Sequence, residues 1–224
     1  MFAWIGAALF VVSLTYFAYS FLITYAAPAA ATARGAIAFD AALFTVFALH
    51  HSVFARAGVR AVVTRLVPAG LERSFYVWVA SLLFIGVCAF WQPVGGVLWD
   101  VGGAPLALLW MLQLFGGYLT VRSAAIIDIW ELSGVAGPRA STGPSDFKTV
   151  GPYGWVRHPI YSGWFLVVFA ASPMTGTRFL FAVVSSLYLL LAIPFEERSL
   201  RATTEGAYDR YIQRVPWKLV PGVY

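Results

Sequence analysis

Long apolar stretches separated by short polar segments dominate this chain. A helix needs about 20 apolar residues to cross a bilayer core of about 30 Å, and four stretches approach or exceed that length. Two shorter stretches flank residues 173–178, where Pro173 and Gly176 predict the tight turn of a helical hairpin. The pattern therefore predicts an all-α, polytopic integral membrane protein with about six transmembrane helices. The expected helices cover residues 3–25, 37–54, 75–91, 105–127, 160–172 and 179–194.

Composition and charge agree with a membrane location. Charged residues make up 11% of the chain, whereas soluble domains carry about 25%. Of the 15 Lys and Arg residues, 12 fall within residues 55–73, 128–158 and 198–224. The positive-inside rule then places both termini and the two long loops in the cytoplasm, and we expect a bacterial inner membrane. Because the basic residues flank apolar runs, the net charge of +5 points to membrane lipids and away from nucleic acid.

Two regions of different character divide the chain. Residues 1–130 form the predicted four-helix transmembrane region, and residues 131–224 contain a polar loop, the helical hairpin and a cytoplasmic tail. The loop of residues 131–157 holds several Gly and Pro residues, and a loop of this length in a compact protein is usually functional or disordered. The tail mixes Arg, Tyr and Trp, which is also typical of an amphipathic segment on an anionic leaflet.

Polar residues gather at the two ends of the hairpin. Arg157 and His158 precede its first helix, and Glu196 and Glu197 follow its second. Since the helices are antiparallel, these four side chains should meet at one membrane face. Such residues are costly near lipid and are candidates for a functional site. The alternative is an interfacial anchor, because Arg, His, Tyr and Trp favour that depth in any case.

The order of motifs in the last third of the chain favours a functional site over an interfacial anchor. The stretch GPYxxxRHPxYxG at 151–163, EExxL at 196–200 and a Gly, Tyr and Arg segment at 206–216 together resemble the core of the integral-membrane S-adenosylmethionine methyltransferases. That superfamily includes isoprenylcysteine carboxyl methyltransferases and phospholipid N-methyltransferases. The resemblance implies S-adenosylmethionine as cofactor, in a pocket open to the cytoplasm. The implied cofactor-binding residues are Tyr153, Arg157, His158, Pro159, Ile160, Tyr161, Glu196 and Glu197.

The same comparison bears on the methyl acceptor. In isoprenylcysteine carboxyl methyltransferases, an arginine one helical turn before the paired glutamates holds the substrate carboxylate, and Ala192 stands there in this chain. Residues 49–56, 72–77 and 128–134 look like the bacterial branch that contains methanethiol S-methyltransferases. The favoured acceptor is therefore a small thiol or another small apolar or lipid-like molecule. A prenylcysteine carboxyl or a phospholipid amine is the alternative.

The histidine pair on the second predicted helix admits two interpretations. A thiol must lose a proton before methylation, so His50 or His51 is a candidate catalytic base; alternatively, the two rings only pack. In a second class of protein, a haem-binding membrane protein related to nitric-oxide metabolism, His50 and His158 would be axial ligands. A non-catalytic scaffold would bind no cofactor. Cys88 is the single cysteine, so we expect no disulfide and no metal site.

Polar and small residues inside the spans suggest helix contacts. Asp40 and Arg122 lie in the second and fourth predicted helices, and an ion pair between them would lower the cost of burying both. Gly116 and Gly117 indicate a close approach of another helix.

Overall fold

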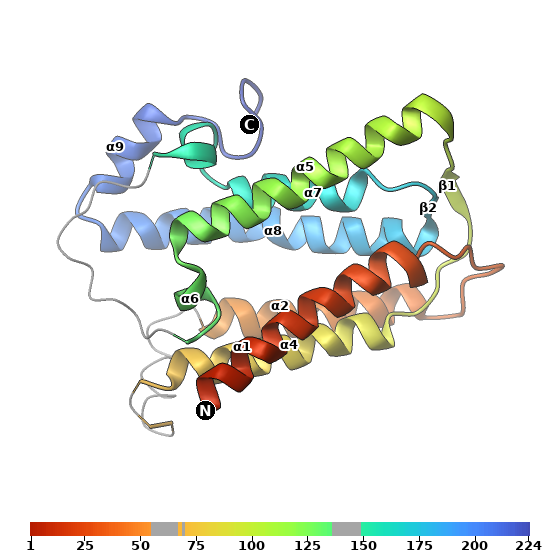
Figure 1. Ribbon diagram of the computed structural model, residues 1–224, viewed down its shortest axis with the longest axis horizontal. Helices are drawn as coiled ribbons and strands as arrows, with labels where there is room; N and C mark the ends of the chain where they lie inside the picture. The colour runs from red at the N-terminus through yellow and green to blue at the C-terminus, as the bar shows by residue number, and fades with distance from the viewer. Residues whose placement is uncertain (55–66, 69, 136–148) are drawn as a thin grey trace. The chain divides into compact units, whose positions relative to one another are not determined.

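The computed structural model describes residues 1–54, 67–68, 70–135 and 149–224, so much of the predicted 131–157 loop lies outside the described part. The described chain is mostly helical (Figure 1). Its elements are α1 (Phe2–Tyr19), the π-helix η1 (Ser20–Thr24), α2 (Ala36–Phe54), α4 (Glu72–Phe90), β1 (Val97–Trp99), α5 (Gly103–Ile127), α6 (Ile129–Leu132), the 3₁₀-helix η2 (Gly151–Gly154), α7 (Pro159–Phe169), β2 (Met174–Thr175), α8 (Gly176–Thr203) and α9 (Ala207–Arg214).

Helices occur at all six predicted positions. Four segments of the described chain are long and apolar enough to cross a membrane, namely Phe2–Thr24, Glu72–Phe90, Gly103–Ile127 and Gly176–Thr203. Helices α2 and α7 are apolar but shorter. The prediction of a helical integral membrane protein is thus confirmed, and a full crossing by α2 and α7 stays a prediction.

Helix α8 is longer than the sequence predicts. The expected end at Pro194 is wrong, because the helix continues to Thr203 with Pro194 inside it. Proline removes one backbone donor and typically costs about 3 kcal/mol in a helix interior. Packing on both sides outweighs that cost, since Ile193 is fully buried and Glu197 is 4% exposed. Glu196 and Glu197 consequently lie on the helix and have fixed directions, which a frayed end would not provide.

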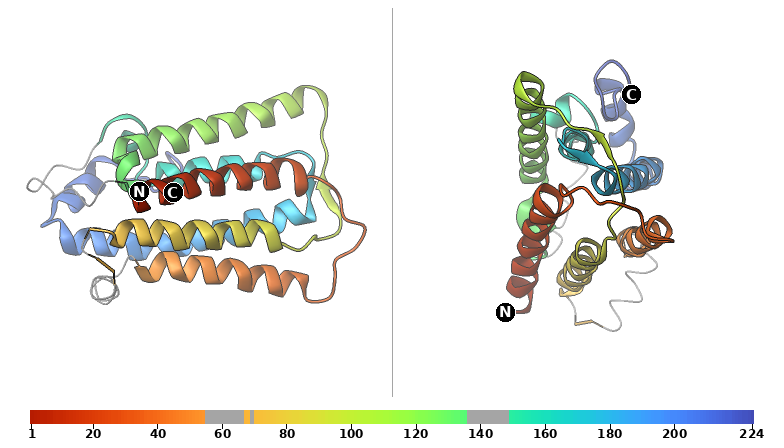
Figure 2. Two further views of the ribbon diagram at one scale, coloured as in Figure 1. Left: turned by 60° about the horizontal axis from the view of Figure 1, so that its bottom comes forward. Right: turned by 90° about the vertical axis from the view of Figure 1, so that its right-hand side faces the viewer.

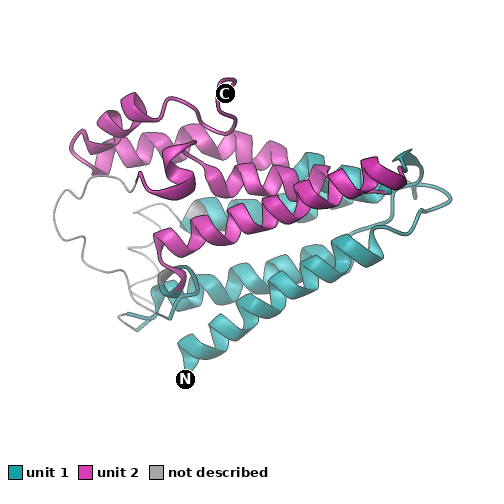
Figure 3. Cartoon of the chain, turned by 45° about the horizontal axis from the view of Figure 1, so that its top comes forward, with its two compact units in different colours: residues 1–100, 130–139, 173–184 teal, residues 101–129, 140–172, 185–224 magenta. Residues whose placement is uncertain are grey.

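The chain divides into two compact units, drawn in different colours in Figure 3. Unit 1 comprises residues 1–100, 130–139 and 173–184, and within it α4 contacts both α1 and α2. The first turns of α8 insert Phe181 into an aromatic core, where its ring lies 5.1–6.0 Å from five other rings. Those rings belong to Phe17, Phe21, Tyr25, Phe44 and Trp91. Strands β1 and β2 pair antiparallel in the same unit.

Buried polar side chains in unit 1 bind backbone groups. Asp40 is fully buried and its Oδ1 accepts the backbone N–H of Gln92 at 2.8 Å. The chain leaves α4 at Trp91, whose ψ of 122° is not helical, so the Gln92 N–H does not continue the helix and donates to Asp40. Arg122 has an exposed side chain and belongs to the other compact unit, so the predicted ion pair between Asp40 and Arg122 stays a prediction. Arg178 likewise donates to the carbonyls of Phe21 and Leu22, each at 2.8 Å.

Helices α5 and α7 run side by side in unit 2, which comprises residues 101–129, 140–172 and 185–224 (Figure 2). Their closest approach is at Gly116 and Gly163. A Cβ atom on Gly116 would lie 2.6 Å from the Gly163 carbonyl oxygen and 2.7 Å from Leu166 Cβ. Glycine at this crossing lets the two backbones touch, as the sequence predicts for Gly116.

We expect Gly116→Ala to lower the free energy of unfolding by about 1–3 kcal/mol, because the added methyl group forces the two helices apart. Gly117→Ala is the matched control, since a Cβ atom there would meet nothing within 4 Å. That control should stabilise the helix by about 0.5–1 kcal/mol through reduced backbone entropy. Denaturation in mixed micelles with rising dodecyl sulfate measures both. Equal effects of the two substitutions would contradict the close crossing.

Candidate active site

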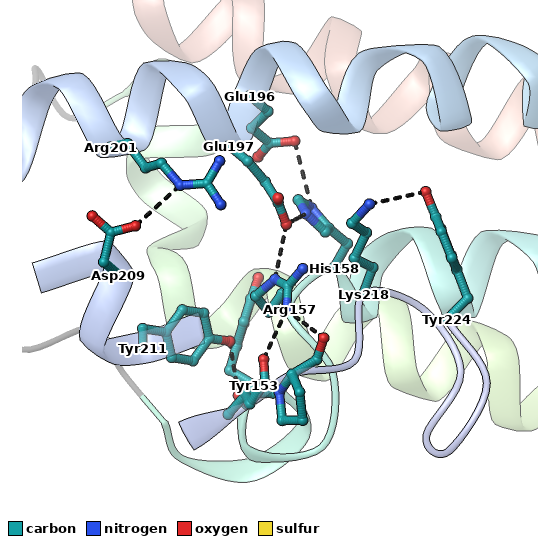
Figure 4. A network of polar contacts seen from close by, with 12 residues as sticks. Tyr153, Arg157, His158, Glu196, Glu197, Arg201, Asp209, Tyr211, Lys218 and Tyr224 are labelled. Carbon is teal, nitrogen blue, oxygen red and sulfur yellow. Dashed lines mark hydrogen bonds and ion pairs between the residues drawn. The ribbon is translucent and has the colours of Figure 1, made fainter. Parts of the chain in front are cut away.

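The predicted site residues of the hairpin meet in unit 2, where α7 begins and the second half of α8 passes (Figure 4). Proline at the first helical position pre-sets the backbone for a helix, and it restricts the preceding residue to non-helical angles. Pro159 therefore starts α7, and His158 caps it with φ of −121° and ψ of 61°. The Arg157 and His158 side chains are thereby directed at α8.

A single carboxylate oxygen organises the buried centre of this site. Glu197 Oε1 accepts Arg157 Nε at 2.8 Å and lies 3.2 Å from His158 Nε2 (Figure 4). The three residues are only 4–7% exposed. Unpaired charges are very costly at this burial, whereas a hydrogen-bonded pair compensates much of the cost. The network thus holds α7 and α8 in one arrangement.

The backbone of the tail completes the network. Arg157 Nη1 donates to the carbonyls of Val215 at 2.9 Å and Pro216 at 2.5 Å. Residues 217–219 continue the contact with the start of α7, where the backbone N–H groups of Arg157 and His158 donate to the carbonyls of Trp217 and Lys218, both at 2.9 Å. Sequence reasoning missed this role, because a carbonyl oxygen is common to every residue type.

Glu196 occupies the open side of the site. Its side chain is 45% exposed, and its Oε2 accepts the Tyr161 hydroxyl at 2.9 Å and lies 3.6 Å from His158 Nδ1. The His158 and Tyr161 rings stack with centroids 5.4 Å apart. Burial raises the pKa of Tyr153, and the charges of Tyr211 and Glu196 raise it further. Tyr153 therefore stays neutral.

The remaining predicted residues and α9 support this arrangement. Pro159 is buried and Ile160 is half-buried in the first turn of α7. On α9, Tyr208 and Tyr211 pack with Val215 in a small core, and the Tyr211 hydroxyl donates to the Tyr153 carbonyl at 2.8 Å. Burial raises the pKa of Tyr211 to about 12. The three-residue spacing of the two tyrosines on an amphipathic helix was the available signal for this contact.

The histidine pair lies in unit 1, at the end of α2. His51 Nδ1 is hydrogen-bonded to the hydroxyl of Tyr76, and the His50 ring stacks on the Tyr76 ring at 5.5 Å. The Arg73 guanidinium lies 5.4 Å from the centre of that tyrosine ring. His50 Nε2 is buried and has no hydrogen-bond partner among the described residues.

The geometry does not favour the haem alternative. Both ring nitrogens of His158 face carboxylates, Glu197 at 3.2 Å and Glu196 at 3.6 Å, so neither is directed at an open ligand position.

These features define an integral membrane protein with a partly open polar site built on the last long helix. The sequence profile of the Isoprenylcysteine carboxyl methyltransferase (ICMT) family matches residues 143–202. A methanethiol S-methyltransferase of Crocosphaera subtropica is 35% identical over 192 residues, covering 83% of this chain and 75% of the relative. One of Mycobacterium tuberculosis is 36% identical over 193 residues, covering 81% and 79%. A Nurim homologue of Drosophila melanogaster is 27% identical over 189 residues, covering 75% and 72%.

No solved structure matches the chain significantly. The identities and coverage show that the chain belongs to the family of membrane methyltransferases that contains the methanethiol S-methyltransferases. It is therefore an enzyme that moves a methyl group from a donor to a small-molecule acceptor.

Proposed function

We propose that this enzyme transfers a methyl group from S-adenosylmethionine to the sulfur of a small thiol such as methanethiol. The relatives that match most of the chain are named methanethiol S-methyltransferases, which supports the thiol. The observation that carries the proposal is Glu196, a half-exposed carboxylate held by Tyr161 and His158 beside a buried network that is satisfied within the protein.

The residues present fit the chemical groups of this donor. S-adenosylmethionine carries an ammonium, a carboxylate and a positively charged sulfur. Glu196 can accept the ammonium or a ribose hydroxyl, and the faces of Tyr153 and Tyr161 suit the sulfonium charge. His158 contributes to this site through its ring, which stacks on Tyr161. Its two ring nitrogens face Glu197 and Glu196 and its backbone N–H donates to Lys218, so we do not assign it to the donor carboxylate. Arg157 and Glu197 position these groups through their buried pair.

When bound, S-adenosylmethionine supplies an electrophilic methyl group. The chain must hold the acceptor in line and keep the site dry, because in-line displacement depends chiefly on positioning. A thiol acceptor must also lose its proton, and His50 and His51 stay the predicted bases. Of the two, His50 is the better candidate, since its Nε2 is without a partner among the described residues while His51 is engaged by Tyr76.

A carboxylate acceptor is less well supported. Ala192 offers no charge at the position where the isoprenylcysteine enzymes carry arginine. Arg157 does not replace it, because its Nε and Nη1 donors are directed at Glu197 and at two tail carbonyls.

We also propose that α2 and α7 bring the number of spans to six. The distribution of Lys and Arg supports a bacterial inner membrane with both termini cytoplasmic, and therefore a donor pocket open to the cytoplasm. In this arrangement residues 1–130 form a four-helix transmembrane region and residues 131–224 form the catalytic core. The acceptor would enter from the bilayer, and the basic residues would contact membrane lipids in preference to nucleic acid.

The test is a methyl-transfer assay with the purified protein in lipid nanodiscs and isotopically labelled S-adenosylmethionine. Methanethiol, a prenylcysteine and phosphatidylethanolamine are offered in parallel, and labelled dimethyl sulfide is measured in the headspace. We expect label to appear in dimethyl sulfide. Label in the prenylcysteine ester or in the phospholipid would replace the proposed acceptor. If the protein does not bind S-adenosylmethionine and shows a Soret band, the proposal is wrong and the protein binds haem.

A further inference from the structure

The tail presents an apolar and cationic face to the outside. We name as the tail face Trp217, Lys218, Val220, Val223 and Tyr224. Val223 is 76% exposed and Val220 is 50% exposed, while Trp217 and Tyr224 are 37% and 45% exposed. The tail thus continues the exposed apolar surface of the chain into a segment that also carries Lys218.

The tail face lies beside the start of an apolar helix. The Ser162 hydroxyl, on the first turn of α7, donates to the Leu219 carbonyl at 2.7 Å. Helix α7 is apolar but shorter than the four candidate spans, and in the proposed six-span arrangement its first turn lies at the membrane surface. Tryptophan and tyrosine concentrate at that level in membrane proteins, with one part of the ring apolar and another wet.

The charge of this region is complementary to anionic lipid headgroups. Residues 207–224 contain three basic residues and one acidic residue, Asp209, which is paired with Arg201 at 3.1 Å. Arg210 and Arg214 are exposed on α9. Lys218 Nζ lies 3.1 Å from the Tyr224 hydroxyl and 4.5 Å from the centre of its ring, so charge and aromatic surface occur together (Figure 4).

We infer that the tail face, with Arg210 and Arg214 beside it, docks on the headgroups of anionic phospholipids at the membrane surface. The same segment carries the carbonyls that hold Arg157 and His158. Docking therefore stabilises the tail in the conformation that closes the site, and anionic lipid strengthens binding of the methyl donor. The statement about donor binding rests on the proposed function, whereas the docking rests only on the proposed membrane crossing by α7.

An environment-sensitive dye at the tail tests the docking directly. Val223→Cys in a Cys88→Ala background provides one labelling position, and the protein is placed in nanodiscs of phosphatidylcholine with a rising fraction of phosphatidylglycerol. We expect a blue shift of emission as the anionic fraction rises, and a loss of this shift at high salt. Unchanged emission across the series would overturn the docking.

Charge variants show whether the proposed residues cause the shift. Lys218→Gln and Arg210→Gln should each weaken the response about fivefold, since one basic residue near an anionic surface contributes about that factor. Arg34→Gln is the matched control, because it removes one exposed charge from another part of the chain and should leave the response unchanged. If Arg34→Gln weakens the emission shift as much as Lys218→Gln does, the shift depends on net charge alone, and the proposed docking by the tail face is wrong. Soluble glycerophosphate should give no emission shift. A shift with glycerophosphate would show that the tail binds a free phosphate, and the proposed docking on a lipid surface would be wrong.

Calorimetric titration of S-adenosylmethionine in both kinds of nanodisc tests the coupling. The coupling is supported if the wild type binds the donor more tightly in phosphatidylglycerol nanodiscs and if Lys218→Gln shows a smaller gain in affinity. Equal affinities in the two lipids would overturn the coupling while the dye still reports docking. No donor binding in either lipid, together with a normal dye response, would refute the proposed function and leave the docking standing.

Discussion

Replacing Glu197 by alanine should lower the free energy of unfolding by about 3–5 kcal/mol, because the substitution leaves Arg157 buried without its carboxylate. The side chains of the pair are 4% and 5% exposed, and their N to O distance is 2.8 Å. His158 also loses its partner at 3.2 Å. Denaturation of the detergent-purified variant by dodecyl sulfate, followed by circular dichroism, measures the change.

An exposed ion pair elsewhere in unit 2 provides the matched control. Arg201 and Asp209 are joined at 3.1 Å, with side chains 47% and 58% exposed. Asp209→Ala should cost less than about 1 kcal/mol, since solvent screens the charges. A double variant that replaces Arg157 and Glu197 with Met and Leu should cost less than the sum of the single changes. Equal costs for Glu197→Ala and Asp209→Ala would contradict the buried network as a main support of the site.

Replacing Glu196 by glutamine should weaken S-adenosylmethionine binding roughly tenfold to a hundredfold, which corresponds to the loss of one charge-assisted contact. The substitution preserves shape and the contact with Tyr161, so only the negative charge is removed. Stability should change little, because the side chain is 45% exposed. Isothermal titration calorimetry gives the dissociation constant, and a thermal melt of the same sample gives the stability.

Glu205→Gln is the control for this experiment. Glu205 is exposed, and the same isosteric change there removes one negative charge outside the site. Donor affinity should be retained in this variant. If Glu196→Gln binds the donor as tightly as the wild type, the donor site lies elsewhere and Glu196 has no part in it.

The two experiments separate the roles of neighbouring carboxylates. Glu197 is turned into the protein, where it holds Arg157 and His158, and Glu196 is turned to the open side. We therefore expect the first substitution to act mainly on stability and the second mainly on donor affinity. Adjacent positions on a helix point about 100° apart, and this rotation explains why two identical side chains differ.

The sequence by itself determined the class of the protein and the position of its helices. Apolar runs have the length that a bilayer requires, and the ordered motifs from Tyr153 to Glu197 identify the methyltransferase core. These signals are local in the chain. The burial of Arg157, and the separate surroundings of Glu196 and Glu197, are not local properties, since they depend on which elements pack against each side chain.

Only the tertiary structure decided how the site is closed and how the buried charges are satisfied. Packing carries α8 through Pro194 to Thr203, although proline predicts an end there. Asp40 accepts the backbone N–H of Gln92, a partner that no side-chain pattern in the sequence reveals. The carbonyls of residues 215–218 hold Arg157 and His158. Backbone groups are identical along the chain, so their partners are chosen by the fold alone.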